Sequence, residues 1–156
     1  MKIKYLSSIL ALLLLISVIG CAAPSVPVVT RVIDGDTIEV SIAGTIYKVR
    51  YIGIDTPELD DKRAELCALA QEATRYNREL LEGKSVRLEK DVSETDKYGR
   101  LLRYVYVGGT FVNAELVRRG LAWAIPYPPD TKYQDELDEA EAEARQAGKG
   151  LWAITH

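Results

Sequence analysis

The sequence predicts a mainly β, α+β domain built as a five-stranded barrel with three helices packed around it. Two observations predict the strands: apolar and polar residues alternate in short segments, and glycine or proline ends most of those segments. A third observation predicts the helices, because apolar residues recur three or four positions apart in three longer stretches. Hydrophobic residues make up 47% of the 156 positions, which is enough for one core.

The strands come as a group of three followed by a group of two. In the second strand Ile38, Val40 and Ile42 share one face, and Ala43-Gly44 turns the chain into the third strand. The fifth strand is closed by Gly108-Gly109. The five predicted strands cover residues 28–33, 38–42, 45–54, 85–89 and 101–107.

The helices lie between and after these strands. The first carries an apolar stripe from Leu66 to Leu81 and is stopped by Gly83. The second is predicted over Val112–Arg119, and the third begins at a cap near Asp130-Thr131 and ends at Gly148. Three strands, a helix, two strands and further helices are typical of an OB-type barrel, a fold that often binds oligonucleotides but does not by itself decide function.

The first twenty residues are typical of a signal peptide, with Lys2 and Lys4 before an apolar run over 5–19. The run is shorter than the roughly 20 residues of a spanning helix, and a retained anchor helix is the alternative. The run leads into VIGC, residues 18–21, which resembles the lipobox of bacterial lipoproteins. Cys21 is therefore predicted to be acylated and to become the first mature residue.

Three parts of the chain follow from this pattern: a signal peptide over 1–20, a lipid-anchored tether over 21–27 and a folded domain over 28–156. We expect a monomer outside the cytoplasm, attached to the cell membrane through the lipid on Cys21, or secreted if the lipobox is not used. A lipidated Cys21 leaves Cys67 without a partner for an intrachain disulfide. Cys67 is predicted to be a small buried hydrophobic residue.

Charge and histidine content narrow the chemistry. The formal net charge is −3, and removing Lys2 and Lys4 leaves 18 basic against 23 acidic side chains. This balance argues against broad electrostatic coating of nucleic acid, so positive charge must be concentrated locally. The one histidine is the last residue, His156, which excludes Ser-His, Cys-His and histidine-zinc sites. Acid–base or metal chemistry therefore falls to carboxylates, which select hard cations.

Two motifs carry carboxylates at strand ends. In DGDT (residues 34–37) Asp34 is expected to hydrogen-bond nearby backbone amides, while Asp36 is expected to point into a cleft. In IDTPE (residues 54–58) Pro57 holds Thr56 extended, which leaves the Thr56 carbonyl available to a cation beside Asp55. Such an oxygen-only set suits calcium better than magnesium. Glu58 lies one turn further on.

Arginines and tyrosines supply the possible substrate contacts. Arg50 lies within a strand, where its planar fork suits two oxygens of one phosphate, and Arg100 opens another strand after Gly99. Tyrosines 98, 127 and 133 either stack on a base or pack in the core, and the sequence leaves both interpretations open.

Taken together, these motifs resemble the thermonuclease family, represented by staphylococcal nuclease. The resemblance rests on VIDGDTIEV, VRYIGIDTPE, ETDKYGRLLRYVYV, FVNAELVRRGLA and GKGLW, and it extends from about residue 28 to 152. It implies a calcium-dependent endonuclease that hydrolyses the 5′ P–O bond of DNA and RNA and leaves 3′-phosphates.

The resemblance also implies a role for each matching residue. Calcium is held by Asp36, Asp55 and the Thr56 carbonyl, and Glu58 is the general base. The remaining positions contact the substrate, with Arg50 and Arg100 clamping the phosphate, Lys97 and Tyr98 touching nucleotide phosphate, and Tyr127 stacking on the base.

Two segments of the sequence depart from the family pattern. Residues 125–133 differ from the usual aromatic segment, and the acidic stretch 59–67 puts tight binding of long duplex DNA in question.

The sequence leaves two rival functions. One rival is a non-catalytic OB-fold lipoprotein that binds nucleic acid, and the other is a structural lipoprotein of the envelope. A non-catalytic domain would not need Glu58 or the Asp36–Asp55 pair.

Overall fold

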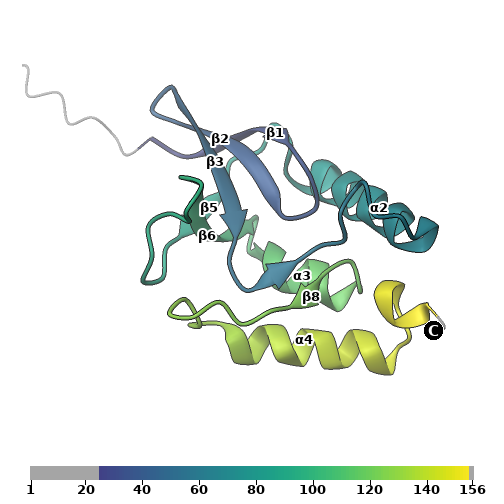
Figure 1. Cartoon of the computed structure of the whole chain (residues 1–156). Coiled ribbons are helices and arrows are strands. Elements are labelled where there is room, and N and C mark those ends of the chain that lie inside the picture. Colours follow the sequence, from purple (N-terminus) through teal and green to yellow (C-terminus); the bar gives the residue numbers. More distant parts are fainter. Residues whose placement is uncertain (1–24, 155–156) are drawn as a thin grey trace, which may run out of the picture.

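The computed structural model describes residues 25–154, and Figure 1 shows their arrangement. The predicted signal peptide, the lipobox with Cys21 and the last residue, His156, lie outside the described residues. The main sheet has the strand order β1-β2-β3-β6-β5, with β3 and β6 parallel and the other neighbours antiparallel. Its strands are β1 (Val28–Val32), β2 (Thr37–Ile42), β3 (Thr45–Tyr51), β5 (Arg87–Glu89) and β6 (Leu101–Val107).

Three short strands and a 3₁₀ turn complete the β and terminal elements. The strand β7 (Thr110–Phe111) pairs with β6, and β4 (Ile54–Asp55) pairs with β8 (Trp123–Ala124) away from the main sheet. The described chain ends with the 3₁₀ turn η1 (Gly150–Ala153). The predicted mainly β, α+β fold with the OB strand order is confirmed.

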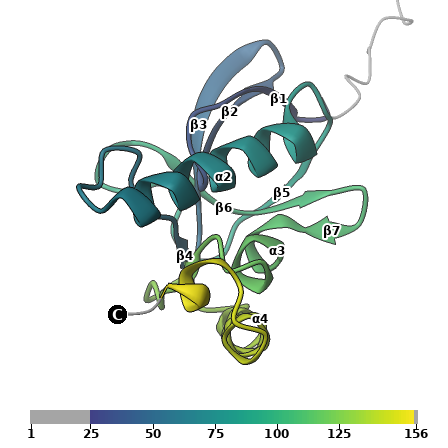
Figure 2. The same ribbon diagram turned by 90° about the vertical axis from the view of Figure 1, so that its right-hand side faces the viewer.

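Three helices pack around the sheet. They are α2 (Ala64–Leu81), α3 (Val112–Arg118) and α4 (Gln134–Gln146). Figure 2 shows α2 lying across the strands, with α3 and α4 stacked on the other side of β4. The first two helices match their predicted ranges. The predicted cap of the third is wrong, because α4 begins only after Tyr133 and the Asp130 side chain binds a different loop.

The predicted strand over 45–54 is broken in the structure. The strand β3 ends at Tyr51, and Gly53 turns the chain with a φ of +77°. A Cβ at Gly53 would lie 2.5 Å from Leu137 Cδ1, so helix α4 packs directly on this backbone. The break sends β4, and with it Asp55, out of the sheet.

The sheet does not close into a barrel through a continuous ladder, in contrast to the prediction. The Val29 amide donates to the Lys84 carbonyl at 3.0 Å, and the Gly83 amide donates to the Val29 carbonyl at 2.9 Å. One bridge between Val28 and Ser85 follows. These bonds join β1 to the residues before β5, so the barrel is closed only at that point.

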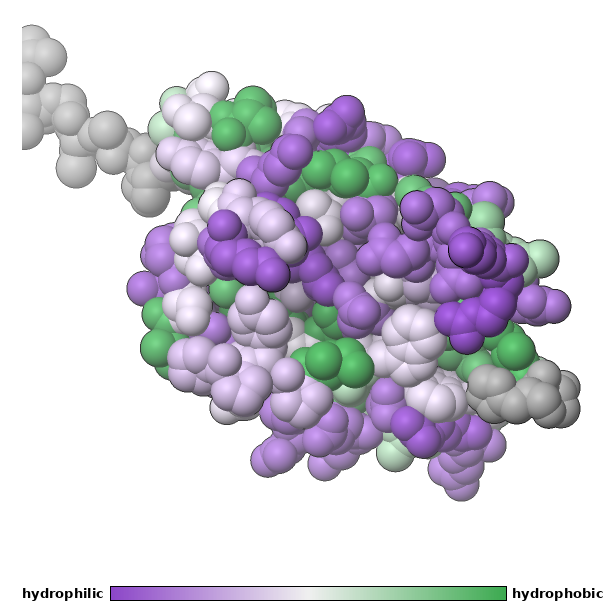
Figure 3. Space-filling model, in the orientation of Figure 1, coloured by the Kyte–Doolittle hydropathy of each residue, from purple (hydrophilic) through white to green (hydrophobic). Residues whose placement is uncertain are grey.

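The larger of two apolar clusters lies between the sheet and the helices, with residues such as Val40, Val49 and Leu116 fully buried. The smaller cluster contains Ile52, Leu102 and Tyr104. Cys67 is only half-buried, contrary to its predicted place in the core, and its thiol donates to the Leu59 carbonyl at 3.3 Å. Apolar side chains on the face in Figure 3 are scattered among polar ones. Within residues 25–154, no helix combines the length and apolar character that crossing a membrane requires.

Candidate active site

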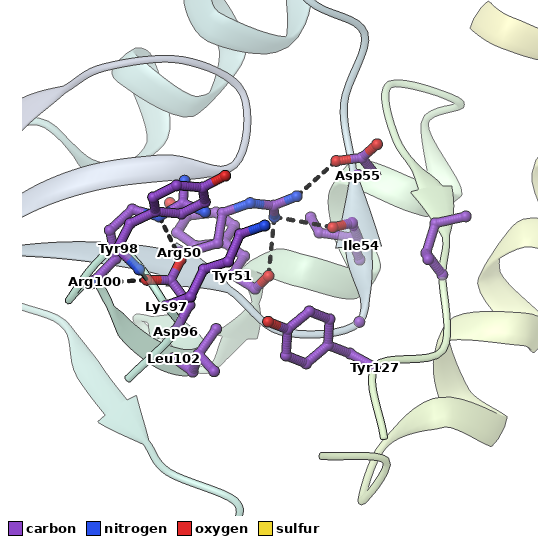
Figure 4. A pocket seen from close by; sticks show the side chains of 12 residues that line it. Arg50, Tyr51, Ile54, Asp55, Asp96, Lys97, Tyr98, Arg100, Leu102 and Tyr127 are labelled. Atoms are coloured by element: carbon purple, nitrogen blue, oxygen red, sulfur yellow. Dashed lines mark hydrogen bonds and ion pairs between the residues drawn. The ribbon is translucent and has the colours of Figure 1, made fainter. Parts of the chain in front are cut away.

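A cleft of about 510 Å³ opens where the ends of β3 and β4 meet two loops (Figure 4). One loop, residues 96–100, precedes β6, and the other, residues 125–127, follows β8. The side chains and backbone that line it belong to Arg50, Tyr51, Gly53, Ile54, Asp55, Asp96, Lys97, Tyr98, Arg100, Leu102, Ile125 and Tyr127.

Arg50 lies at the centre of the cleft. Its Nη1 donates to the carbonyls of Tyr51 at 3.0 Å and Ile54 at 2.9 Å, across the turn that separates β3 from β4. Its Nη2 donates to Asp55 Oδ1 at 2.6 Å, and its Nε lies 3.2 Å from Asp36 Oδ1. The guanidinium therefore bridges two carboxylates that are 19 positions apart in the sequence.

Asp36 is held in place by the turn before β2. A Cβ at Gly35 would lie 2.7 Å from Thr56 Cγ2 and 2.8 Å from Ala73 Cβ, so only glycine lets this turn fit between Thr56 and α2. The buried Asp36 accepts from the Thr56 amide at 2.9 Å and from the Thr56 hydroxyl at 3.1 Å. Asp34 accepts from the Asp36 amide at 3.0 Å, which confirms its predicted structural role.

Burial and mutual repulsion both disfavour the charged form of the carboxylates in this region. Burial raises the pKa of the Asp55 carboxyl, and the ion pair with Arg50 only partly offsets this effect. Burial and the charge of Asp36 together raise the pKa of Asp34 to about 6. Negative charge concentrated in this way is stabilised by a cation, and in the described structure that cation is Arg50.

The opposite wall of the cleft is a tight turn built on Asp96. Its Oδ1 accepts from the amides of Tyr98 and Arg100 at 2.9 and 3.0 Å, and its Oδ2 accepts from Arg100 Nε at 2.6 Å. Gly99, with a φ of +78°, completes the turn. Lys97, Tyr98 and Arg100 are thereby presented to the cleft, with both cations near the Tyr98 ring.

The structure separates the three tyrosines whose roles the sequence left open. Tyr98 and Tyr127 line the cleft and are 71% and 42% exposed. Tyr133 packs edge-on against Tyr104 and donates its hydroxyl to Glu89 at 2.8 Å, so it is a packing residue.

Most predicted site residues come together, but Asp36 and Thr56 are buried and are not among the residues that line the cleft; Asp36 contacts it through its ion pair with Arg50. Glu58 does not line the cleft either. Its side chain is exposed, and its predicted role as general base stays a prediction. Six residues that line the cleft were not predicted as site residues: Tyr51, Gly53, Ile54, Asp96, Leu102 and Ile125. The pattern of an aspartate three residues before Gly99 is a turn signal that would have identified Asp96, whereas no local pattern marks the other five as cleft residues.

The donor set fits a hard cation in its chemistry. Within residues 25–154, no three Asp, Glu, Cys or His side chains converge as a ready metal cage. Asp36 and Asp55 nevertheless reach one cationic group, and Thr56 is bound to Asp36. Carboxylate and carbonyl oxygens are ligands that calcium takes, with waters at its remaining positions.

Comparison with known proteins identifies the family. The family model described as Staphylococcal nuclease homologue matches residues 48–154, about two thirds of the chain. The chain belongs to the staphylococcal nuclease family. Within it, this chain is 40% identical over 125 residues to a thermonuclease from Staphylococcus hyicus, an alignment that covers 80% of this chain and 74% of that protein.

Other relatives of this nuclease-family chain agree. It is 40% identical to a thermonuclease from Staphylococcus intermedius, over 80% of this chain and 74% of that protein. It is 41% identical to the SPbeta prophage-derived endonuclease YokF of Bacillus subtilis, over 79% of this chain but 42% of that longer protein. The predicted family and the predicted enzyme class, a nuclease-type hydrolase, are confirmed.

Proposed function

We propose that the protein is a calcium-dependent, sugar-non-specific endonuclease that hydrolyses the 5′ P–O bond of DNA and RNA and leaves 3′-phosphates. The observation that carries the proposal is the Arg50 bridge between Asp36 and Asp55 at one wall of a cleft whose other wall presents Lys97 and Arg100. The names of the similar thermonucleases and endonucleases support cleavage of nucleic acid.

Asp36, Asp55 and the Thr56 carbonyl are the groups that would hold calcium. When bound there, calcium supplies positive charge to the phosphate that is attacked. Asp36 is already fixed by the Thr56 amide and hydroxyl, so it is pre-oriented, whereas the side chain of Asp55 is 51% exposed and more easily turned.

The two arginines bind the phosphate. Asp96 engages Arg100, a residue that lines the cleft, through Nε, which leaves the two terminal nitrogens of the guanidinium free of this carboxylate. Arg50 gives Nη2 to Asp55 in the described structure, and this donor would be available to a phosphate oxygen if Asp55 were held by a cation instead. Donors of this kind, aimed at charge that develops in the transition state, are each worth about 10²–10³ in rate.

Glu58 takes the proton of the attacking water. It follows Asp55 by three residues, after Pro57 has turned the chain, and its carboxylate is exposed. A positioned general base contributes about 10²–10⁴ in rate.

Aromatic side chains explain the broad substrate range. Tyr98 and Tyr127 present exposed rings on two sides of the cleft, where a base can stack. Stacking does not depend on the sugar or on the base sequence, so both DNA and RNA are accepted. The predicted lipid on Cys21 would attach this activity to the outside of the cell membrane, and a monomer suffices for it.

The test is cleavage by the purified chain of single-stranded DNA, duplex DNA and RNA, with calcium and with excess chelator. We expect cleavage only with calcium and products that end in 3′-phosphates. Full activity in chelator would contradict the metal assignment, and 3′-hydroxyl ends would contradict the bond assignment. Binding without cleavage under every condition would favour the nucleic-acid-binding module.

A further inference from the structure

A buried asparagine connects helix α2 to the turn that carries Asp36. Asn77 is fully buried, and its amide nitrogen donates to the carbonyls of Asp34 at 3.1 Å and Gly35 at 3.2 Å. Its amide oxygen accepts from the Tyr51 hydroxyl at 3.0 Å. The side chain therefore uses both donors and its acceptor on groups that surround the site.

Helix α2 touches this loop at a second point. Ala73, one helical turn before Asn77, lies where a Cβ on Gly35 would meet it at 2.8 Å. The helix thus presses on the loop at Ala73 and bonds to it at Asn77. A loop held by both contacts has one position relative to the helix, and the next residue of the loop is Asp36.

Tyr51 extends the connection to both members of the ion pair. Its amide donates to the Asp36 carbonyl at 3.0 Å, and its own carbonyl accepts from Arg50 Nη1 at 3.0 Å. The Tyr51 ring is buried, so its hydroxyl has to be satisfied inside the protein, and Asn77 provides the acceptor.

We propose that Asn77, together with the Tyr51 hydroxyl, is a positioning residue that fixes the Asp36 carboxylate for metal binding; this inference rests on the proposed function. The pair does not touch substrate or metal. It acts through the main chain of residues 34–36 and keeps Asp36 Oδ2 in reach of the Thr56 amide, the contact that pre-orients the carboxylate. Partners of this kind, one contact removed from a metal ligand, typically change metal affinity or activity by about 10–100-fold.

The variants are Asn77→Leu, which keeps the branched shape and the number of heavy side-chain atoms and removes all three hydrogen bonds, and Tyr51→Phe, which removes one of them. The matched control is Thr74→Ala on the same helix. Thr74 is also buried, but its hydroxyl bonds only to the Ala70 carbonyl of its own helix. Tyr51→Phe keeps the test informative if Asn77→Leu does not fold.

The first measurement is amide hydrogen exchange of the full chain without calcium, followed residue by residue by NMR. The exchange of the β6 amides serves as the reference for overall stability, and the exchange of the Thr56 amide is corrected for any change in it. After this correction we expect the Thr56 amide to exchange about tenfold faster in Asn77→Leu. In Tyr51→Phe the change should have the same direction but be smaller. Thr74→Ala should leave the corrected value unchanged. If Thr56 follows the β6 amides in both site variants, Asn77 stabilises the fold only and the inference is wrong.

The second measurement is the midpoint of calcium binding to the folded chain, obtained by calorimetric titration. We expect it to rise about tenfold in Asn77→Leu and to be unchanged in Thr74→Ala. An unchanged midpoint in Asn77→Leu would overturn the inference. A wild-type chain that does not respond to calcium would instead overturn the proposed function, while the exchange of the Thr56 amide would still decide whether Asn77 positions the turn.

Discussion

Replacing Arg50 with methionine should lower cleavage and raise calcium affinity at the same time. Arg50 holds Asp55 at 2.6 Å and Asp36 at 3.2 Å, and its side chain is 17% exposed. Two unit charges about 4 Å apart interact by about 4 kcal/mol at an effective dielectric constant of about 20. Because Asp55 is half-exposed, we discount this to roughly 1–2 kcal/mol of competition against a second cation.

That competition sets the expected change in calcium affinity, and the loss of the phosphate donor sets the expected change in cleavage rate. Removing the competition corresponds to about a tenfold lower calcium midpoint, since 1.4 kcal/mol is a factor of ten. Removing the phosphate donor should lower the cleavage rate at saturating calcium by about 10²–10³. Calorimetric titration with calcium gives the first quantity, and single-turnover cleavage of a DNA oligonucleotide gives the second.

The matched control is Arg31→Met, another ion-paired arginine in a strand, which binds Glu39 far from the cleft. It should change neither quantity. If calcium binds Arg50→Met more weakly than the wild type, Arg50 organises the carboxylates rather than competing for them. Cleavage at the wild-type rate would remove Arg50 from the catalytic groups.

Three further predictions concern single acidic side chains. Glu58→Gln should lower the cleavage rate by about 10²–10⁴ with unchanged denaturant unfolding; a rate near that of the wild type would refute the general-base role. Asp130→Ala should lose about 1–3 kcal/mol of unfolding free energy, because Asp130 accepts from the Val92 and Ser93 amides at 2.9 and 2.7 Å, and Asp130→Asn should recover most of it. Hydrogen bonding, chiefly from Lys132, lowers the pKa of Glu89 to about 2, so its contribution is complete above pH ~4.5 and is lost as the pH falls towards ~2. The free energy of unfolding of Glu89→Gln should differ from that of the wild type by about 1 kcal/mol near pH 7, and this difference should shrink as the pH falls through about 2. A constant difference across this range would contradict the assignment.

The sequence predicts elements where one local pattern dominates. The stripe from Leu66 to Leu81 repeats over the whole of α2 and ends at a glycine, so both the element and its end were predictable. The third strand was predicted as one piece because its alternation continues to Ile54. Its break at Gly53 depends on Leu137 of α4, which packs on that backbone from 84 positions away.

In the candidate site, too, residues with a local signal were predictable and residues that depend on distant partners were not. Asp36 and Asp55 were predicted from their places at strand ends and Arg50 from its place within a strand. The pairing of Thr37 with Arg50 across β2 and β3 brings Asp36 and Arg50 together. Asn77 could not have been predicted, because an asparagine on a helix has no local signal that it will be buried against a turn 42 residues earlier. Buried polar groups become visible only once the partners that satisfy them are known.

The balance of charge in the cleft supports the proposed requirement for a divalent cation. Arg50, Lys97 and Arg100 face or approach Asp36, Asp55 and Asp96, so the charged groups of the site nearly cancel. A phosphate therefore meets little net attraction from these groups alone, and a bound calcium would add two positive charges and compete with Arg50 for Asp55. Substrate affinity should then fall together with cleavage when calcium is chelated, which gel-shift titration of an uncleavable phosphorothioate oligonucleotide can measure. Tight binding in chelator would mean that the groove attracts nucleic acid without the metal, as a pure binding module would.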